Sequence, residues 1–400
     1  RTRRASTAVD TTAVLRVGTT AGLDAVGVAA AEGWSDARIT MEGRVAAGLV
    51  DTMRFTYGHP ERSTDPRTAL PGATAVVVGA LGYRRPAEPS VPAASPGDPA
   101  GRVATYVWDD SYGELRVALR AVADHLLAGG WRARVLVDDN ALVDRVAAHR
   151  AGLGWFGKNA NLLLPGRGSW FVLGGVVTDA PLLAAPAPPP ASSSGGSDPV
   201  ATGVPGGRVG ERSCGACRRC LDGCPTGAIV APGVVDAGRC LSWLLQRHGP
   251  FPRQYREVLG DRIYGCDDCQ EVCPPNRRAD AAMNGAQPTR GAGAVDLLDL
   301  LAAGDADLLA RHGRWYVPRR DPDHLRRNAL LVLGNVGDAT DSRVVAAVDR
   351  YLAHPSPVLR EQAAWTARRL GLVALVTAHA DDPVVAAELA APAPAPGAGG

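Results

Sequence analysis

The chain has 400 residues, of which 46% are hydrophobic and 21% are charged, and its 43 basic and 41 acidic residues leave a net charge of +2. This composition is typical of a globular protein of roughly two or three domains. The near balance of charge argues against a surface coated with basic residues for nucleic acid but allows a local basic patch. No apolar run approaches the roughly 18 residues of a membrane span and no apolar stretch follows the basic first residues, so we expect a cytoplasmic protein without a membrane anchor or a secretory signal.

Strands and helices are expected to alternate in the first 179 residues. Residues 73–83 and 131–139 have the apolar composition of buried strands, and a helical pattern lies between them at 113–130. A further helix should begin near Ala141, and two strands should follow in "NLLLPG" and "SWFVLGGVVTD", joined by the turn "PGRG". This order predicts an α/β domain over residues 1–179.

Three segments have compositions that cannot bury much apolar surface. Residues 84–104 and 180–210 are rich in proline, alanine, serine and glycine, and the chain ends in "APAPAPGAGG". Such compositions favour loops and linkers. We therefore predict a loop at 84–104, a flexible insertion or linker at 180–210 and a disordered tail at 386–400.

Lys158 is the only lysine, because every other basic residue of the chain is an arginine. A compact ammonium group can occupy sites that the wide, planar guanidinium group cannot. A lone lysine among arginines therefore indicates a specific site, although its persistence at the surface by chance is an equally good explanation of this feature taken alone.

The eight cysteines are concentrated in two short stretches, with Cys240 alone between them. A cytoplasmic location disfavours disulfides, so a metal is the better explanation. The first stretch, "CGACRRCLDGCP", matches the spacing C-x2-C-x2-C-x3-C-P of two-cluster ferredoxins, in which the fourth cysteine binds the other cluster. Zinc, which prefers separated Cys-x-x-Cys pairs or histidines, is the disfavoured alternative.

The ferredoxin rule assigns every cysteine to one of two 4Fe–4S clusters. The first cluster is expected to be bound by Cys214, Cys217, Cys220 and Cys273. The second is expected to be bound by Cys224, Cys240, Cys266 and Cys269. We therefore predict a ferredoxin-like two-cluster domain over residues 211–285.

The C-terminal part contains an internal repeat, because residues 325–337 and 359–371 match at an offset of 34 residues. This period predicts HEAT-like helical repeats over residues 286–385. A free-standing solenoid needs at least about three repeats, so these two should pack against the rest of the protein.

An arginine-rich segment, "RHGRWYVPRRDPDHLRR", comes directly before the repeats. Arginines interleaved with exposed aromatic residues are typical of contacts with an RNA backbone and unstacked bases. The predicted contacts are Arg319, Arg320, Arg326 and Arg327. A solvated helix face, with Trp315 and Tyr316 in the core, explains the stretch equally well.

Several motifs together resemble one enzyme family. The stretches "IYGCDDCQEVCPPN", "AGLGWFGKN" and "GSWFVLGG", with the helical pair at the C-terminus, are similar to those of the epoxyqueuosine reductases over roughly residues 18–375. The resemblance implies an α+β multidomain protein with an α/β cobalamin-binding domain, a two-cluster ferredoxin-like domain and HEAT-like repeats. It also implies reduction of epoxyqueuosine to queuosine in tRNA by cobalamin that two 4Fe–4S clusters supply with electrons.

The resemblance also implies site residues and partners. It places the general acid at Asp138 and a base-off cobalamin without a histidine ligand, in agreement with the lack of an Asp-x-His-x-x-Gly motif. Lys158, Asn159, Ser169 and Gln246 are the further expected contacts of the corrinoid. The alternative for this region is a glycine-terminated helix followed by a hairpin, with Asp139 or Asn140 as the helix cap.

The implied partners are the anticodon stem-loop of tRNA and a ferredoxin or flavodoxin as electron donor, and we expect a monomer. Two other functions fit parts of the sequence. One is a corrinoid iron–sulfur enzyme like the reductive dehalogenases, and the other is a ferredoxin-like electron-transfer or assembly module. The sequence does not identify the electron donor, the preferred tRNA, the order of cobalt attack and proton transfer, or the role of residues 180–210.

Overall fold

The computed structural model describes residues 9–84, 97–186, 214–282 and 293–395. The chain forms two compact units, each built from segments that are distant in sequence. Unit 1 comprises residues 1–85, 110–238 and 268–286, and unit 2 comprises residues 86–109, 239–267 and 287–400. Each unit therefore combines parts of several segments predicted as domains, and most of the predicted 180–210 insertion lies outside the described residues.

The larger sheet of unit 1 has the strand order β1-β2-β7-β4, and each neighbouring pair is antiparallel. Its strands are β1 (Ala25–Ala30), β2 (Ala75–Gly82), β4 (Ala133–Val137) and β7 (Phe171–Thr178). Because β2 and β4 are both antiparallel to β7, they run parallel to each other. The two strands and the helix predicted between them are present, but β7 lies between the strands and every pairing in the sheet is antiparallel, so this domain is α+β rather than the expected α/β domain.

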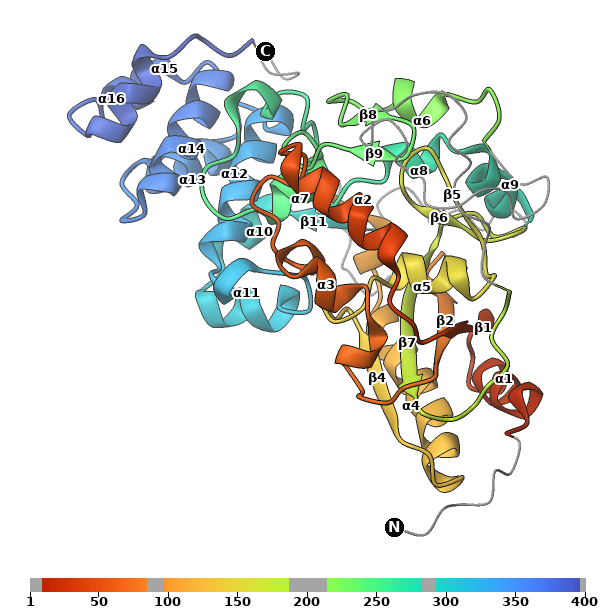
Figure 1. Cartoon of the computed structure of the whole chain (residues 1–400). Helices are drawn as coiled ribbons and strands as arrows, with labels where there is room; N and C mark the ends of the chain where they lie inside the picture. The colour runs from red at the N-terminus through yellow and green to blue at the C-terminus, as the bar shows by residue number, and fades with distance from the viewer. Residues whose placement is uncertain (1–8, 85–96, 187–213, 283–292, 396–400) are drawn as a thin grey trace. The chain divides into compact units, whose positions relative to one another are not determined.

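Helices cover both faces of this sheet (Figure 1). On one face α4 (Ser111–Ala128) packs against β2, β4 and β7, and on the other α5 (Asp144–Arg150) packs against β1, β2 and β7. Gly27 on β1 allows the end of α5 to lie close to the sheet. A Cβ at this position would lie 2.5 Å from the carbonyl oxygen of Ala151, which follows α5. The other helices of unit 1 are α1 (Thr11–Thr20), α2 (Ser35–Ala46), α3 (Pro60–Ser63), α6 (Arg219–Asp222), α8 (Asp268–Glu271) and α9 (Pro274–Ala282).

Two short hairpins complete unit 1. The first pairs β5 (Trp155–Phe156) with β6 (Leu162–Leu163), and the second pairs β8 (Ile229–Ala231) with β9 (Val234–Val235). The two strands predicted around the turn "PGRG" are present, and an isolated antiparallel bridge between Leu164 and Gly168 closes the turn, but β6 and β7 do not form a longer ladder with each other. The buried, apolar β7 is used instead as an inner strand of the large sheet, where it pairs along both edges.

Unit 2 contains a three-stranded sheet in the order β10-β3-β11. The central strand β3 (Ala100–Val103) is parallel to β10 (Arg262–Tyr264) and antiparallel to β11 (Ala294–Asp296). The prediction of a loop throughout 84–104 is therefore wrong for β3. This strand is held by main-chain hydrogen bonds on both sides, which its composition does not reveal.

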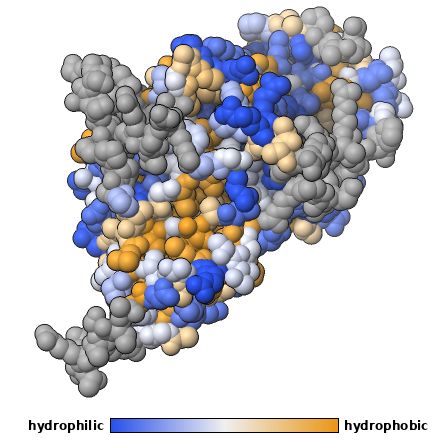
Figure 2. Space-filling model, turned by 90° about the vertical axis from the view of Figure 1, so that its right-hand side faces the viewer, coloured by the Kyte–Doolittle hydropathy of each residue, from blue (hydrophilic) through white to orange (hydrophobic). Residues whose placement is uncertain are grey.

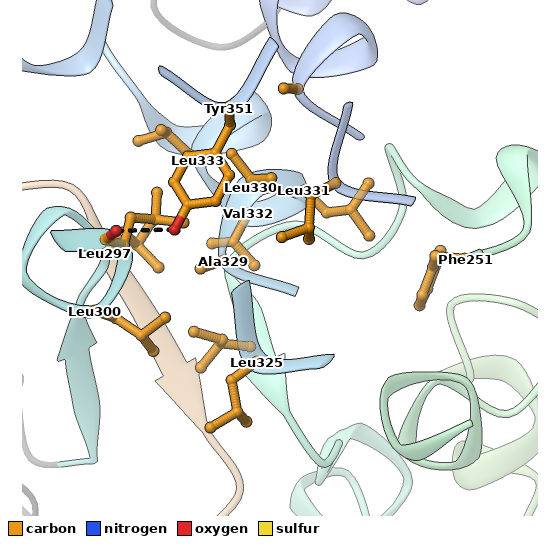
Figure 3. Close-up of a cluster of buried hydrophobic side chains, with 14 of the residues drawn as sticks. Phe251, Leu297, Leu300, Leu325, Ala329, Leu330, Leu331, Val332, Leu333 and Tyr351 are labelled. Atoms are coloured by element: carbon orange, nitrogen blue, oxygen red, sulfur yellow. Dashed lines mark hydrogen bonds between the residues drawn. The ribbon is translucent and has the colours of Figure 1, made fainter. Parts of the chain in front are cut away.

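Helices make up most of unit 2. They are α7 (Leu241–Gln246), α10 (Leu297–Ala302), α11 (Asp305–His312), α12 (Asp323–Val336), α13 (Ser342–Leu352), α14 (Pro357–Arg369), α15 (Val373–Thr377) and α16 (Pro383–Ala390). Twelve of the 14 residues of α12 are buried, so this helix forms the centre of the unit. Figure 3 shows its apolar residues beside Leu297, Leu300 and Tyr351, whose hydroxyl donates to the Leu301 carbonyl at 2.8 Å.

The two copies of the internal repeat fall on α12 and α14, which pack against each other. The matched positions Leu325 and Leu359 are fully buried, as are Ala329 and Ala363. Helix α16 extends past residue 386, where the tail was predicted to begin, so helical structure continues further than expected. The arrangement fits a pair of helical repeats, and their HEAT-like class stays a prediction.

Some large hydrophobic side chains remain exposed, among them Leu183 at 81% and Val117 at 66%. On the face shown in Figure 2, hydrophobic residues gather in one area and hydrophilic residues lie around it. Within the described ranges, no helix has both the length and the apolar character needed to cross a membrane.

Candidate functional site

Four cysteines come together in unit 1. Cys214 and Cys217 are joined by a turn in which the Cys217 N–H donates to the Cys214 carbonyl at 2.9 Å, and Cys220 lies on α6. Cys273 lies between α8 and α9, and α6 packs against α8. Both Cys220 and Cys273 are buried. These are the four residues that the ferredoxin rule assigns to the first cluster.

The four thiols are close enough to affect one another's ionisation. Burial raises the pKa of Cys220 to about 11, and the neighbouring Cys214, Cys273 and Cys217 contribute to the rise. Burial likewise raises the pKa of Cys273, against an opposing hydrogen bond from the Asn276 backbone. Crowded, buried thiolates need a compensating cation, and the iron of an iron–sulfur cluster supplies one. The donor set therefore fits a 4Fe–4S cluster.

The other four cysteines are divided between the units, with Cys224 and Cys269 in unit 1 and Cys240 and Cys266 in unit 2. The Ala228 N–H donates to the Cys224 sulfur at 3.2 Å, and such bonds tune cluster ligands. Assignment of these four to a second cluster stays a prediction. Among the described residues, no three His, Cys, Asp or Glu side chains lie within reach of a single metal ion, which a cluster with one cysteine per iron does not require.

Lys158 contacts the first cysteine segment. Its Nζ donates to the carbonyl oxygens of Gly215 at 2.7 Å and Cys217 at 2.9 Å. Its own carbonyl oxygen accepts a hydrogen bond from the Gly233 N–H at 2.8 Å. The lone lysine thus has a specific place in the structure, but this place gives no support to its expected contact with the corrinoid.

Asn159 and Ser169 contact the second cysteine stretch, which runs from Cys266 to Cys273, and the residues directly after it. The Asn159 Nδ2 donates to the Cys269 carbonyl at 3.2 Å, and the Asn276 Nδ2 donates to the Ser169 hydroxyl at 2.9 Å. Both predicted residues are buried, so their expected contacts with the corrinoid also lack support. Asn276, which the sequence analysis missed, was signalled only by its place directly after the Cys-Pro-Pro motif.

Gln246 and Gly154 each have a structural role within the protein. Gln246 ends α7 in unit 2, where its Nε2 donates to the Tyr106 hydroxyl at 3.1 Å. A Cβ at Gly154 would lie 2.2 Å from the Leu163 carbonyl oxygen, so the β5–β6 pairing itself requires glycine there. Gln246 and this glycine therefore do not identify a corrinoid site.

Asp138 lies where β4 ends and has the character expected of an acid. Its φ is +50°, a left-handed conformation that non-glycine residues rarely adopt, and its side chain is exposed. Partial burial of the carboxyl group raises the pKa of Asp138, which Arg116 opposes and Asp139 reinforces. Within the described part of the chain, no group donates a hydrogen bond to this carboxyl group, which leaves it able to bind a ligand.

Asp139 has a local structural role. Its Oδ1 accepts a hydrogen bond from the Ala141 N–H at 2.8 Å, which stabilises the turn after β4. The following helix begins at Asp144 rather than near Ala141, and no side chain caps it at Val143. The prediction that Asp139 or Asn140 caps the helix is therefore wrong, because this turn separates them from it.

Polar side chains of α12 bind the main chain next to two cysteines of unit 2. The Asn328 Nδ2 donates to the Leu245 and Ile263 carbonyls, each at 3.0 Å. Leu245 lies on α7, which follows Cys240, and Ile263 lies on β10, which precedes Cys266. Asn328 is fully buried and therefore joins the two segments that carry these cysteines.

Arg327 reinforces the same contact. It is 1% exposed, and its guanidinium donates to the carbonyls of Leu244, Leu245, Arg247 and Gly249. Burial lowers the pKa of Arg327 to about 9, with contributions from Arg247 and Arg256. The expectation that this residue contacts RNA is wrong, since its side chain is enclosed in unit 2.

Replacing Asn328 by Leu should remove the cluster assigned to Cys240 and Cys266, with loss of about half of the iron. The change removes the Asn328 donor from the Ile263 carbonyl, and an unsatisfied buried carbonyl costs about 1–3 kcal/mol. The Leu245 carbonyl loses one donor but still accepts from Arg327. Asn335 on the same helix is a matched control, because its Nδ2 donates to the Arg256 and Gly260 carbonyls. Asn335→Leu should cost similar stability in urea and keep all iron; equal iron loss in both variants would contradict the assigned role.

Residues 213–276 match the family model described as a 4Fe-4S double cluster binding domain. This match confirms the prediction of iron–sulfur clusters. The epoxyqueuosine reductase of Bacillus cereus is 30% identical over 90% of this chain and 88% of its own length. The chain belongs to the epoxyqueuosine reductase family. The epoxyqueuosine reductase of Xanthomonas campestris is 32% identical, over 82% of this chain and 87% of its own.

Solved structures of epoxyqueuosine reductases have the same fold. One contains an epoxyqueuosine-modified stem loop of tRNA-Tyr; it is 26% identical, with a TM-score of 0.79 over 94% of this chain and 96% of that chain. In another, from Bacillus subtilis, also 26% identical with a TM-score of 0.76 over 94% and 96%, a catalytic aspartate loop is swung out of the active site.

Proposed function

We propose that this chain reduces epoxyqueuosine to queuosine in tRNA. Its membership of the epoxyqueuosine reductase family over most of its length is the observation that carries the proposal. The converging thiols of unit 1 support it, because a reductase needs a path for electrons. Removal of the epoxide oxygen leaves an alkene and releases water, which consumes two electrons and two protons.

Two 4Fe–4S clusters carry the electrons in this proposal. Cys214, Cys217, Cys220 and Cys273 bind one, and Cys224, Cys240, Cys266 and Cys269 bind the other. The proximity and burial of the first four thiols support the first assignment. The second rests on the spacing rule.

Cobalamin is the proposed reductant of the epoxide, held base-off without a histidine ligand. When bound, the corrinoid supplies electrons to the substrate from low-valent cobalt. Of the five residues expected to contact it, Asp138 fits such a group, because its carboxyl is exposed and accepts no hydrogen bond from the described residues. The other four use their polar side chains within the protein.

Asp138 is the proposed proton donor to the departing oxygen. Its raised pKa keeps a larger fraction of the carboxyl group protonated near neutral pH than an ordinary aspartate would have. The position at the end of β4 fixes its main chain, while the exposed side chain can reach a substrate. The Bacillus subtilis relative has a catalytic loop that is named by an aspartate and is swung out of the active site in one structure, which supports this assignment.

Arg319 and Arg320 are the proposed contacts with tRNA. Both are exposed and both have positive φ values, 54° and 53°, which non-glycine residues adopt at a cost. Tyr316 nearby is 58% exposed and available for stacking, whereas Trp315 is buried against Tyr264. The stem loop bound by a relative supports tRNA as the partner.

Arg326 is not suitable for this role. It is 8% exposed, and its guanidinium forms ion pairs with Asp305 at 2.6 Å and Asp323 at 2.9 Å. Like Arg327, it stabilises α12, and its loss would weaken tRNA binding only by damaging the fold. The prediction that it contacts RNA is therefore wrong.

Replacing Arg319 and Arg320 together by Ala should weaken tRNA binding and reduce its salt dependence. Each lost phosphate contact removes roughly one released counterion from the slope of log K against log salt. The matched control is Arg311→Ala with Arg343→Ala, which removes the same charge from arginines already paired with Asp299 and Asp341. Binding measured at several salt concentrations should change little in the control, and an equal change in both would contradict direct contact.

The remaining partners follow from the same chemistry. We propose a ferredoxin or flavodoxin as the electron donor, since a chain that binds iron–sulfur clusters accepts single electrons. The anticodon stem-loop is the proposed part of tRNA that binds, and the HEAT-like helices around α12 and α14 are proposed to help hold it. The protein is proposed to act as a cytoplasmic monomer.

The proposal is tested by nucleoside mass spectrometry of tRNA from a strain that lacks this gene. Epoxyqueuosine should accumulate and queuosine should disappear, and restoring the gene should reverse both changes. Normal queuosine in the deletion strain, with no second reductase encoded, would contradict the proposed function.

A further inference from the structure

The segment after β5 contacts both cysteine stretches of unit 1. Lys158 donates to the Gly215 and Cys217 carbonyls, at 2.7 and 2.9 Å. On the other side, the Asn159 Nδ2 donates to the Cys269 carbonyl and the Asn161 Nδ2 donates to the Gln270 Oε1 at 3.1 Å. Polar contacts thus connect this segment to the main chain or side chains beside the cysteines.

The main chain of Lys158 is itself fixed. Its carbonyl oxygen accepts a hydrogen bond from the Gly233 N–H, in the turn between β8 and β9. The neighbouring β5–β6 hairpin holds the segment from the other direction. Because the main chain of Lys158 is fixed at this point, its ammonium group can bind the Cys214–Cys217 turn in only a narrow range of positions. The hydrogen bonds from Lys158 therefore position this turn.

The shape of the contact explains why lysine stands here in a chain that otherwise uses arginine. One Nζ atom binds two carbonyl oxygens within a single turn, one of them on Gly215, whose φ is +47°. An ammonium group places its three donors around one atom, whereas a guanidinium spreads its donors over a plane. Arginine would therefore need the turn to open.

The charge of Lys158 is not neutralised by a protein carboxylate. Among the described residues, no aspartate or glutamate lies within ion-pair distance of its Nζ. The ammonium group instead lies beside the turn that carries two of the thiolates that would bind the cluster. A fixed cation beside a cluster favours its reduced, more negative state, and net charge and hydrogen bonding are main determinants of cluster potentials.

We propose that Lys158 positions the Cys214–Cys217 turn and raises the reduction potential of the cluster bound by Cys214, Cys217, Cys220 and Cys273. This inference rests on the proposed clusters. It gives the lone lysine a role in electron flow in place of contact with the corrinoid. Lys158 acts here as a positioning residue, through the turn that carries two of the ligands.

The test is an EPR-monitored redox titration of the purified, cluster-loaded protein. Lys158→Met keeps the aliphatic stem and removes the charge, and Lys158→Gln keeps a hydrogen-bond donor without the charge. Both should lower the midpoint potential of one cluster and leave the other unchanged. Lys158→Arg should give a midpoint potential between those of the neutral variants and the wild type, because it keeps the charge in a poorer geometry.

Arg278 provides the matched control. It is exposed and close enough to affect Cys273, but it donates no hydrogen bond to the Cys214–Cys217 turn. Arg278→Met removes the same charge and should shift the potential less, because solvent screens it. An equal shift in this control, or unchanged potentials in both neutral Lys158 variants, would overturn the proposal.

The outcome is distinct from that of the proposed function. If the Met variant retains only half of its iron while the other cluster persists, the positioning role is supported, and the Gln variant then tests the charge. Two wild-type clusters without reduction of epoxyqueuosine would overturn the function and leave the potential shift standing. Normal reduction with unchanged potentials would overturn the role of Lys158 alone.

Discussion

Replacing Asp138 by Asn should reduce the rate of epoxide reduction by about 10²–10⁴-fold, the usual contribution of a general acid. The substitution keeps the size of the side chain and removes its transferable proton. Because Asp138 accepts no hydrogen bond from the described residues, the folded structure should be unaffected. The measurement is single-turnover conversion of a modified stem loop with chemically reduced corrinoid, which does not depend on the clusters.

The matched control is Asp139→Asn. Asp139 binds the Ala141 N–H, and an asparagine oxygen can accept the same bond, so the rate should stay within a few-fold of wild type. Near-normal conversion by the Asp138 variant under these conditions would remove Asp138 from the mechanism.

The pH dependence provides an independent check of the same residue. Partial burial of the carboxyl group raises the pKa of Asp138, and the acid acts only when protonated, so the rate should fall as pH rises through this raised pKa. In Asp138→Asn this limb of the profile should disappear. Persistence of the same limb in the variant would assign it to another group.

Replacing Cys273 by Ser should remove the cluster that it shares with Cys214, Cys217 and Cys220, together with about half of the iron. Cys273 lies far from these residues in sequence but is coupled to them in the fold, because Cys214 and Cys217 contribute to its raised pKa. Multiple-turnover reduction with an external electron donor should fall below detection. Iron analysis and EPR measure the loss directly.

A selective effect is the critical part of this prediction. Single-turnover conversion with chemically reduced corrinoid should remain, because the substitution leaves Asp138 and the large sheet intact. A variant with two complete clusters would contradict the ligand assignment. Loss of single turnover as well would show that the substitution had damaged the whole unit.

The cysteine pattern was the most informative part of the sequence. Metal ligation restricts spacing so strongly that the order of the cysteines along the chain groups Cys214, Cys217 and Cys220 with Cys273. The fold places these four near one another, and their binding of one cluster stays a prediction. Buried strands such as β2 could also be predicted from the sequence, because a run of eight apolar or glycine residues is typical of a buried strand.

Contacts between distant segments could not be predicted in the same way. Lys158, Asn159 and Ser169 were expected to contact the corrinoid, but their partners are main-chain and side-chain groups more than 50 residues away. Arg326 and Arg327 have the sequence signature of a basic surface, and burial in unit 2 was decided by packing around α12. Local composition does not record which side of a helix the rest of the fold covers.

The most direct test of the proposed function is reconstitution of the reaction with purified protein. Protein loaded with iron, sulfide and corrinoid should convert an epoxyqueuosine-containing stem loop to queuosine in the presence of a low-potential reductant, with loss of one oxygen atom detected by mass spectrometry. Omission of the corrinoid should abolish conversion. Unchanged epoxyqueuosine in the presence of intact clusters and bound, reducible corrinoid would contradict the proposed function.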